Sequence, residues 1–389
     1  MADLKKKPII AICYDFDKTL SPDDMQSQGF IQSVHSDVGE FWQESNGLAK
    51  NNDMDQNLAY MYLMATKSRG MHVFNKKMLM EYGAKLKLFP GVSTWFKRID
   101  TYAKRRNVVV EHYIISSGLK EMIEGNVIAP YFKKIYASSF YYDDAGIAVW
   151  PAQVVNYTNK TQFLFRIEKG ILDVNDQRVN DFYPPEEIRI PFRNIVYIGD
   201  SDTDVPCMKL VNLNGGYSIG VYNSETKDKT KVYKMMNEHR IRYFMPADYT
   251  KGSQLEDLIH KIIDRTQANE VLETAYYNAK NEAYKQCQSQ SDEEKEKETL
   301  ISALEDSQSF AQTNNLISTM TKMSNWTVSQ KNKLIDAALL NQQVKFYLKN
   351  DNARKFFDII CQGINNERAK ELLEMIEKIK TLNIEGNQK

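Results

Sequence analysis

Short apolar runs, rich in β-branched and aromatic side chains, mark the first two thirds of the chain. Four stand out, at residues 9–14, 108–115, 194–198 and 217–222. Most are continuous rather than alternating, which is typical of strands covered on both faces. Several end at a small or acidic residue and lead into a helical stretch, the pattern of a parallel sheet with crossover helices. A weaker run at 134–138 predicts a fifth strand, and the whole pattern predicts an α/β fold.

A long polar stretch at residues 22–87 separates the first two predicted strands. Segments within it, such as 58–64, have a helical pattern, and no strand pattern interrupts them. The stretch is too long for a simple crossover, and it ends near the Pro90-Gly91 turn signal. We therefore expect a separate helical domain over 22–87, with the α/β core formed by 1–21 and 88–264.

Two further insertions lie in the predicted core. The segments 140–142 and 147–150 flank a polar loop that contains glycine, which predicts a β-hairpin. Residues 171–191 are polar and include two consecutive prolines, which predicts an ordered loop.

After about residue 265 the composition changes. Glycine becomes rare, and apolar positions recur at helical spacing to the end of the chain. The region 265–389 is therefore expected to form an α-helical C-terminal extension. It packs either on the core or on a partner, which leaves a protein partner or self-association through these helices as open alternatives. Nothing in this region indicates an activity.

Composition excludes some classes of protein. A length of 389 residues predicts two or three domains. Lys+Arg is 51 and Asp+Glu is 51, so a protein that depends on broad electrostatic attachment to nucleic acid or to an anionic membrane is not expected. No apolar run is long enough for a membrane span or a signal-peptide core, so the expected location is the cytoplasm. The four cysteines form no CxxC pair and are expected to be reduced thiols.

Acidic residues follow two of the predicted strands. Asp15 and Asp17 come directly after the first, and Asp200 and Asp204 follow the strand at 194–198. Ligands of open α/β sheets bind at the carboxyl ends of the strands, so these side chains are expected to share one crevice. Converging carboxylates repel each other unless a cation neutralises them, and a hard, oxygen-binding cation suits such a site. The pattern predicts a Mg²⁺ site completed by water and a substrate phosphate.

Groups that hold anions occur at two other positions. Ser116, Ser117 and Gly118 end the second strand, where a hydroxyl beside the start of the next helix is suited to an anion. Lys160 follows Asn159, which has the pattern of a helix N-cap, so its ammonium is expected in a first helical turn. Carboxylates with a metal on one side, and cationic and N–H groups on the other, favour phosphoryl transfer.

Four motifs, in this order and strand context, resemble those of the haloacid dehalogenase-like (HAD) hydrolase superfamily, over roughly residues 8–264. Asp15-Phe16-Asp17-Lys18-Thr19 resembles the DxDxT motif, and Gly199-Asp200…Asp204 resembles GDxxxD, with Ser201 where that motif usually has Gly. Ser116 resembles the second motif. Lys160 resembles the third, with Lys169 as a rival. The 22–87 insertion resembles the helical C1 cap of phosphoserine phosphatase-like members, and the implied core is a Rossmann-like parallel sheet with helices on both faces.

The resemblance implies a role for each position. Asp15 would be the nucleophile that forms an aspartyl-phosphate, and Asp17 the general acid and base. Asp15, the backbone carbonyl of Asp17 and Asp200 would hold Mg²⁺, and Asp204 would support that metal site or orient the lysine. The expected phosphate-binding groups are Thr19, Ser116, Ser117, Gly118 and Lys160.

The sequence thus predicts a Mg²⁺-dependent phosphatase acting on a small phosphorylated metabolite. Two alternatives stay open. The aspartyl-phosphate could be passed to an acceptor other than water, or the core could be a regulatory module whose C-terminal helices bind a partner. A phosphatase acting on nucleic-acid ends is disfavoured by the zero net charge and by a cap that would obstruct polymers.

Overall fold

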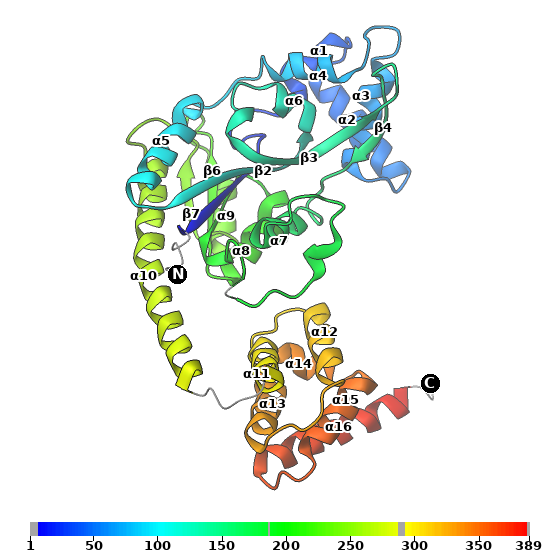
Figure 1. Cartoon of the computed structure of the whole chain (residues 1–389). Helices are drawn as coiled ribbons and strands as arrows, with labels where there is room; N and C mark the ends of the chain where they lie inside the picture. Colours follow the sequence, from blue (N-terminus) through cyan, green and yellow to red (C-terminus); the bar gives the residue numbers. More distant parts are fainter. Residues whose placement is uncertain (1–6, 186, 287–291, 387–389) are drawn as a thin grey trace. The chain divides into compact units, whose positions relative to one another are not determined.

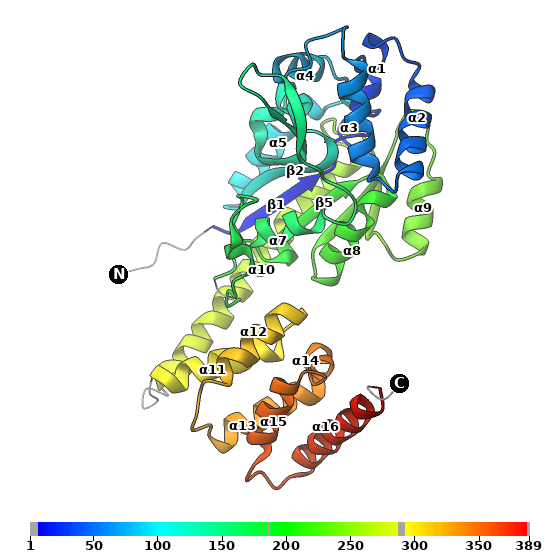
Figure 2. The same cartoon turned by 90° about the vertical axis from the view of Figure 1, so that its right-hand side faces the viewer.

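The structure is a computed structural model that describes residues 7–185, 187–286 and 292–386. The chain forms two compact units (Figures 1 and 2). Unit 1 comprises Met1–Val179 and Ile188–Tyr276, and unit 2 comprises Asn180–Glu187 and Tyr277–Lys389. The boundary expected after residue 264 falls inside a continuous helix, α10 (Gln254–Gln286).

Unit 1 is built on a sheet that has seven strands within the described residues, in the order β4-β3-β2-β1-β5-β6-β7. Every neighbouring pair is parallel except β3 and β4, which are antiparallel. The strands are β1 (Ile9–Tyr14), β2 (Val109–Leu119), β3 (Phe132–Tyr142), β4 (Ala148–Gln153), β5 (Ile195–Gly199), β6 (Tyr217–Tyr222) and β7 (Tyr243–Pro246).

Alternate residues of β1 divide between the two faces of the sheet. Ile10, Ile12 and Tyr14 belong to one hydrophobic cluster, which includes residues of α5 (Val92–Arg105) and α10. Ala11 and Cys13 belong to the other cluster, which includes residues of α7 (Thr161–Lys169), α8 (Val205–Leu213) and α9 (Thr230–Asn237). Helices therefore cover both faces, and the central strand is buried on both sides, as its continuous apolar run predicts.

The predicted hairpin is confirmed as the antiparallel pair β3–β4. The edge strand β7 was not predicted, because its four residues, Tyr-Phe-Met-Pro, are too few to form a clear apolar run and end in proline. Proline is compatible with an edge strand, where one side of the ladder has no partner.

The helical insertion (residues 22–87) contains α1 (Phe30–Ser33), α2 (Val38–Asn51), α3 (Gln56–Lys67) and α4 (Lys76–Gly83), and no strand of the sheet. Asp37, Asp55 and Asn75 cap α2, α3 and α4, because each side chain accepts hydrogen bonds from backbone N–H groups of the first turn. These local caps explain why the insertion divides into several short helices.

The helical insertion is joined to the β3–β4 hairpin. Asn75 and Ile147 form an isolated antiparallel bridge, and the Ala148 amide donates to the Phe74 carbonyl at 2.9 Å. The rings of Phe74 and Phe140 meet edge to face, with centroids 5.1 Å apart. The hairpin is therefore shared between the sheet and the insertion.

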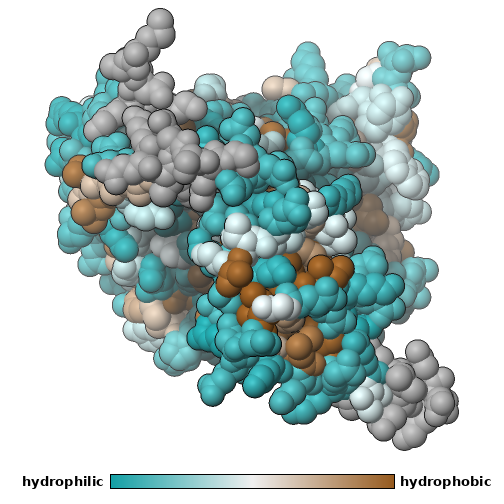
Figure 3. Space-filling model, turned by 60° about the horizontal axis from the view of Figure 1, so that its bottom comes forward, coloured by the Kyte–Doolittle hydropathy of each residue, from teal (hydrophilic) through white to brown (hydrophobic). Residues whose placement is uncertain are grey.

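Unit 2 is helical and has its own hydrophobic cluster. Its helices are α11 (Asp292–Glu305), α12 (Phe310–Met320), α13 (Val328–Leu340), α14 (Gln342–Tyr347), α15 (Asp351–Cys361) and α16 (Glu367–Gly386). Several large apolar side chains of these helices remain exposed, and Figure 3 shows apolar residues gathered on the face turned to the viewer. The most exposed are Phe310, Val328, Leu340, Phe346 and Ile359.

Among the residues that the structure describes, no helix combines the length and the apolar character needed to cross a bilayer. Cys13, Cys207 and Cys361 are buried free thiols, whereas Cys287 lies outside the described residues.

Candidate active site

The predicted acidic residues meet at the carboxyl edge of the central strands. β1 lies between β2 and β5, and the Asp15 amide donates to the Ile198 carbonyl at 2.9 Å, which holds the end of β1 against β5. Asp15, Asp200 and Asp204 each offer a carboxylate oxygen within 4.8 Å of the others, and all three are buried. Because β1 pairs with β5, Asp15 lies beside Asp200 and Asp204, which follow it in the sequence by 185 and 189 positions.

Lys160 supplies a cation beside this acidic group. Its Nζ donates to Asp204 Oδ1 at 2.7 Å and lies 3.5 Å from Asp15 Oδ1, and its side chain is not exposed at all. The helix α7 begins at Thr161, so Lys160 itself is the N-cap residue. The predicted cap at Asn159 is wrong, because the Asn159 side chain accepts from the Asn156 amide and donates to the Val154 carbonyl instead.

The rival Lys169 lies at the other end of α7. Its Nζ donates to the Val179 carbonyl at 2.7 Å. The geometry therefore brings Lys160, and not Lys169, to the carboxylates.

Asp204 is saturated by protein donors. Its Oδ1 accepts from Lys160 and from the Tyr197 hydroxyl at 2.8 Å, while Oδ2 lies 3.3 Å from the Ser201 hydroxyl. With both oxygens occupied, Asp204 is better placed to orient Lys160 than to bind a metal directly. Tyr197 was missed by sequence reasoning, because within the apolar run of β5 it has the pattern of a core residue.

Gly199 leaves room for Asp204. A Cβ at position 199 would lie 2.5 Å from Asp204 Oδ2 and 2.7 Å from its Cγ. The absence of a side chain at the end of β5 thus lets Asp204 fold back against the strand. This is a physical reason for the Gly-Asp pair in the predicted motif.

Burial and mutual repulsion shift the carboxyl groups. Burial, followed by the negative charge of Asp204, raises the pKa of Asp15 to about 6, although Lys160 partly opposes this. Burial likewise raises the pKa of Asp200 well above its usual value, with Asp204 and Asp15 adding to the effect. Burial alone would lower the pKa of Lys160, but Asp15 and Asp204 outweigh it and raise that pKa. The Lys160 ammonium by itself therefore does not neutralise the carboxyl groups of Asp15, Asp200 and Asp204.

Asp17 lies apart from the three clustered carboxylates. Its Oδ1 accepts from the Met25 amide at 2.9 Å, and a Cβ at Gly118 would come within 3.0 Å of its Oδ2. Burial raises the pKa of Asp17 well above its usual value, and the negative charges of Asp24 and Asp15 add to the shift. A raised pKa favours the protonated form of the carboxyl group, the form that a general acid needs.

The other predicted phosphate-binding residues lie around the same edge. Thr19 is fully buried, and its hydroxyl has no hydrogen-bond partner among the described residues. Ser116 is buried and accepts from the Gly118 amide at 3.2 Å, but the expected helix start beside it is wrong, since β2 continues to Leu119.

Ser117 presents its carbonyl to two hydroxyl groups. Tyr60, from α3, donates to it at 2.8 Å, and Ser138, from β3, donates at 3.0 Å. Tyr60 connects the helical insertion to the strand that carries Ser116. It was not singled out by the sequence, where it is one of several aromatic residues in a helical segment.

The donor set suits a hard divalent cation. The groups available are carboxylate oxygens, the ligands that Mg²⁺ prefers. Asp15 Oδ1 is buried and has no hydrogen-bond partner within the described part of the chain, and its only charged neighbour at 3.5 Å is Lys160. Leaving such an oxygen without a partner is costly unless a ligand completes the site. The residues present therefore fit a cation and a phosphoryl group.

No family model matches the chain. Among curated proteins, it is 31% identical over 283 residues to an uncharacterized protein of Borreliella burgdorferi (strain ATCC 35210), a match that covers 96% of that protein and 66% of this chain. About a third of this chain thus has no counterpart in that relative.

Several solved structures are similar at low identity. A HAD family hydrolase from Salmonella enterica serovar Typhi has 17% identity and a TM-score of 0.43, covering 65% of this chain and 70% of its own. A probable phosphoserine phosphatase from Vibrio cholerae has 13% identity and a TM-score of 0.43, covering 68% and 67%. A phospho-aspartyl intermediate analogue of phosphoserine phosphatase has 13% identity and a TM-score of 0.39, covering 65% and 98%.

Proposed function

We propose that this chain, which shares a family with the Borreliella protein, is a HAD-like hydrolase and, more specifically, a Mg²⁺-dependent phosphomonoester hydrolase acting on a small substrate. The observation that carries the proposal is the Asp15 Oδ1 atom, which is buried, lies 3.5 Å from the Lys160 ammonium and has no hydrogen-bond partner among the described residues. The Thr19 hydroxyl, four positions further along the chain, is also buried without a hydrogen-bond partner in that part of the chain. Such groups suit a phosphoryl group and its counter-ion.

Each residue has one task in the proposed reaction. The Asp15 carboxylate attacks phosphorus, and the bond from phosphorus to the substrate oxygen breaks as the aspartyl-phosphate forms. Asp17 gives its proton to the leaving oxygen and then takes one from the water that hydrolyses the aspartyl-phosphate. Lys160, held by Asp204, and the Thr19 hydroxyl bind the phosphoryl oxygens, with Ser116 and the Gly118 amide on the neighbouring strand β2.

The cation would be held by Asp15, Asp200 and the Asp17 backbone carbonyl. When bound, it would neutralise the charge that accumulates on the phosphoryl oxygens. The carboxylates of the site outnumber its ammonium, and a substrate phosphate adds further negative charge, so the residues present cannot supply this neutralisation alone.

The test is the release of inorganic phosphate from a panel of small phosphomonoesters, with Mg²⁺ and with EDTA. We expect Mg²⁺-dependent release that falls at least ~10³-fold in Asp15→Asn and about 10²–10⁴-fold in Asp17→Asn. Asp202→Asn, two positions from Asp200 but exposed, is the matched control. Full activity in folded Asp15→Asn would contradict the mechanism.

Addition of alcohols to the assay tests for transfer to an acceptor other than water. Such transfer would produce a phosphorylated alcohol.

A second candidate role concerns the C-terminal helices. Exposed Leu340, Phe346 and Ile359 favour a protein partner or self-association, which would make the core a regulated or regulating module. A chain ending at Gln286 keeps α10 whole and removes α11–α16. Unchanged phosphate release together with a loss of self-association, measured by light scattering, would support this role. An unchanged oligomeric state would argue against self-association.

A further inference from the structure

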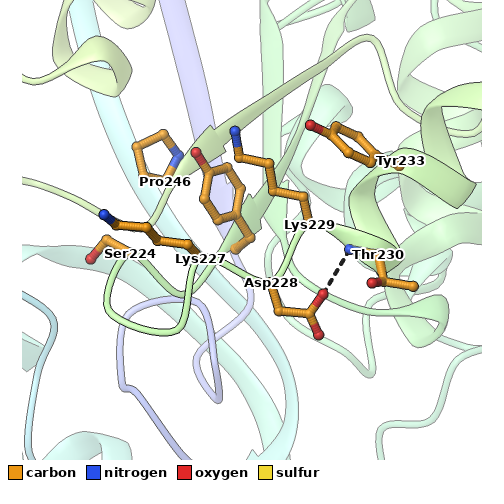
Figure 4. A pocket seen from close by; sticks show the side chains of 8 residues that line it. Ser224, Lys227, Asp228, Lys229, Thr230, Tyr233 and Pro246 are labelled. Carbon is orange, nitrogen blue, oxygen red and sulfur yellow. Dashed lines mark hydrogen bonds between the residues drawn. The ribbon is translucent and has the colours of Figure 1, made fainter.

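A cavity of about 570 Å³ lies at the carboxyl ends of β6 and β7, outside the site described above. It is formed by the loop after β6, the start of α9 and the end of β7 (Figure 4). Its size is in the range of small-molecule sites. The residues that define its chemistry are Tyr222, Ser224, Lys227, Lys229, Tyr233 and Pro246.

The cavity opens at the same edge of the sheet as the candidate active site. β5, whose end carries Asp200, pairs with β6 in the register Gly199 to Gly220, and β6 pairs with β7 in the register Tyr222 to Pro246. β6 and β7 are the second and third strands from β1, which places them about 10 and 14 Å from β1 at the usual strand spacing. One extended small molecule can therefore reach both Asp15 and the cavity.

The polar lining is mainly cationic. Lys227 and Lys229 bring two ammonium groups, and Lys229 Nζ lies 5.2 Å from the centroid of the Tyr222 ring. The lining carboxylate, Asp228, is turned away, since its Oδ1 accepts from the Thr230 amide at 2.9 Å (Figure 4). The two ammonium groups of the cavity thus suit an anion, with the Ser224 hydroxyl as a further donor beside them, whereas the Thr230 side chain is hydrogen-bonded to Asp228.

The loop that carries the lysines is ordered by its own hydrogen bonds. The Asn223 side chain accepts from the Glu225 amide at 2.8 Å, and the Asn223 carbonyl accepts from the Lys227 amide at 3.0 Å. Lys227 has a positive φ of 55°, a conformation that turns the chain back toward α9. Because the loop is already folded, less ordering is needed when a ligand binds.

We propose that this cavity binds a second anionic group, a phosphate or a carboxylate, of the substrate whose phosphoryl group is bound at Asp15. The substrate class would then be a phosphomonoester with a second anion roughly 10–14 Å from the first. The substrate assignment rests on the proposed function, whereas the binding of anions by Lys227 and Lys229 does not.

The first experiment measures binding without turnover. Pyrophosphate is titrated by calorimetry, without Mg²⁺, into Asp15→Asn, and into the same protein with Lys227→Gln and Lys229→Gln added. We expect the double substitution to weaken one binding site about tenfold, since two exposed ammonium groups that face the anion are lost. Lys234→Gln, on an exposed position of α9 outside the cavity, is the matched control and should bind as the parent does.

The second experiment separates substrate from free effector. In the otherwise wild-type protein, Lys227→Gln/Lys229→Gln should raise KM about tenfold for phosphomonoesters that carry a distant second anion, with kcat unchanged. KM for p-nitrophenyl phosphate, which lacks that group, should stay the same. If pyrophosphate instead changes kcat for p-nitrophenyl phosphate in wild type but not in the double variant, the anion is a separate effector and the substrate assignment is overturned.

Equal pyrophosphate binding in the parent and in the double variant would overturn the proposal altogether. Absence of phosphate release from every ester, with pyrophosphate binding still dependent on Lys227 and Lys229, would instead count against the proposed function. The two failures are therefore distinguishable.

Discussion

Lys160 Nζ lies 2.7 Å from Asp204 Oδ1, and neither side chain is exposed to solvent. The pair holds the ammonium 3.5 Å from Asp15, so Asp204 acts through the position of Lys160 rather than on the substrate. A buried ion pair contributes little net stability by itself, but removal of one partner leaves the other charge uncompensated.

Lys160→Met should therefore reduce both activity and stability. We expect phosphate release to fall at least ~10²-fold and the free energy of unfolding to fall by about 3–5 kcal/mol, because three clustered carboxylates lose their cation. The measurements are phosphate release and urea unfolding. Lys169→Met removes a lysine at the far end of the same helix, whose Nζ donates to the Val179 carbonyl, and it should retain turnover. If Lys169→Met abolished turnover and Lys160→Met retained it, Lys169 would be the lysine of the third motif.

Mg²⁺ should stabilise the wild-type protein against heat. A cation that binds only the folded state raises its stability by mass action, so the melting temperature should rise with Mg²⁺ concentration and fall back with EDTA. Asp200→Asn should abolish the increase, whereas Asp202→Asn, whose side chain is exposed, should keep it. An equal increase in both variants would place the cation elsewhere.

Gly199→Ala should disturb the site although no catalytic group is removed. The new Cβ would lie 2.5 Å from Asp204 Oδ2, so Asp204 and with it Lys160 must shift. We expect a loss of about 1–3 kcal/mol in stability and a large fall in turnover. Gly47→Ala in α2, where a Cβ meets nothing within 4 Å, should instead raise stability by up to about 1 kcal/mol. Wild-type turnover in Gly199→Ala would show that Asp204 need not lie against β5.

Glu168 should make stability fall with rising pH. Burial raises the pKa of Glu168 from 4.5 to about 7, with Lys169 opposing the shift. The folded state therefore holds a proton that the unfolded state has lost, and stability decreases between about pH 4.5 and pH 7. Glu168→Gln removes this dependence and should be about 1–2 kcal/mol more stable than wild type at pH 8, with little difference at pH 4. Urea unfolding at the two pH values, with exposed Glu81→Gln as the control, measures it. If Glu168→Gln were more stable than wild type by the same amount at pH 4, the gain would not come from the raised pKa of Glu168.

Sequence reasoning located the acidic groups because they follow apolar strands directly in the chain. Asp15, Asp17, Asp200 and Asp204 are fixed by the ends of β1 and β5, and parallel strands place such ends at one edge. Contacts that depend on packing were not accessible in this way. Tyr197 belongs to a buried hydrophobic cluster, and its hydroxyl donates to Asp204. Tyr60 donates to the Ser117 carbonyl from α3, 57 positions earlier in the chain.

The errors have similar physical causes. Asn159 has the composition of a helix cap, but its side chain forms a turn with Asn156 instead, so the helix starts one residue later. The run after Ile115 contains Ser and Gly, which suggests a strand end, yet β2 continues because β3 pairs with it as far as Leu119. A local turn decided the first case, and pairing with a neighbouring strand decided the second.

The backbone bridge between Asn75 and Ile147 constrains how the helical insertion can swing away from the sheet. A hinge motion must either break the hydrogen bond from the Ala148 amide to Phe74 or carry the whole hairpin along, bending the chain near the base of β3 and β4. Hydrogen exchange of the Ala148 amide therefore shows which of these two motions occurs. If the bond breaks with each opening, its exchange with deuterated solvent follows the opening rate, and if the hairpin travels as a rigid arm, that proton stays protected while the site admits its substrate.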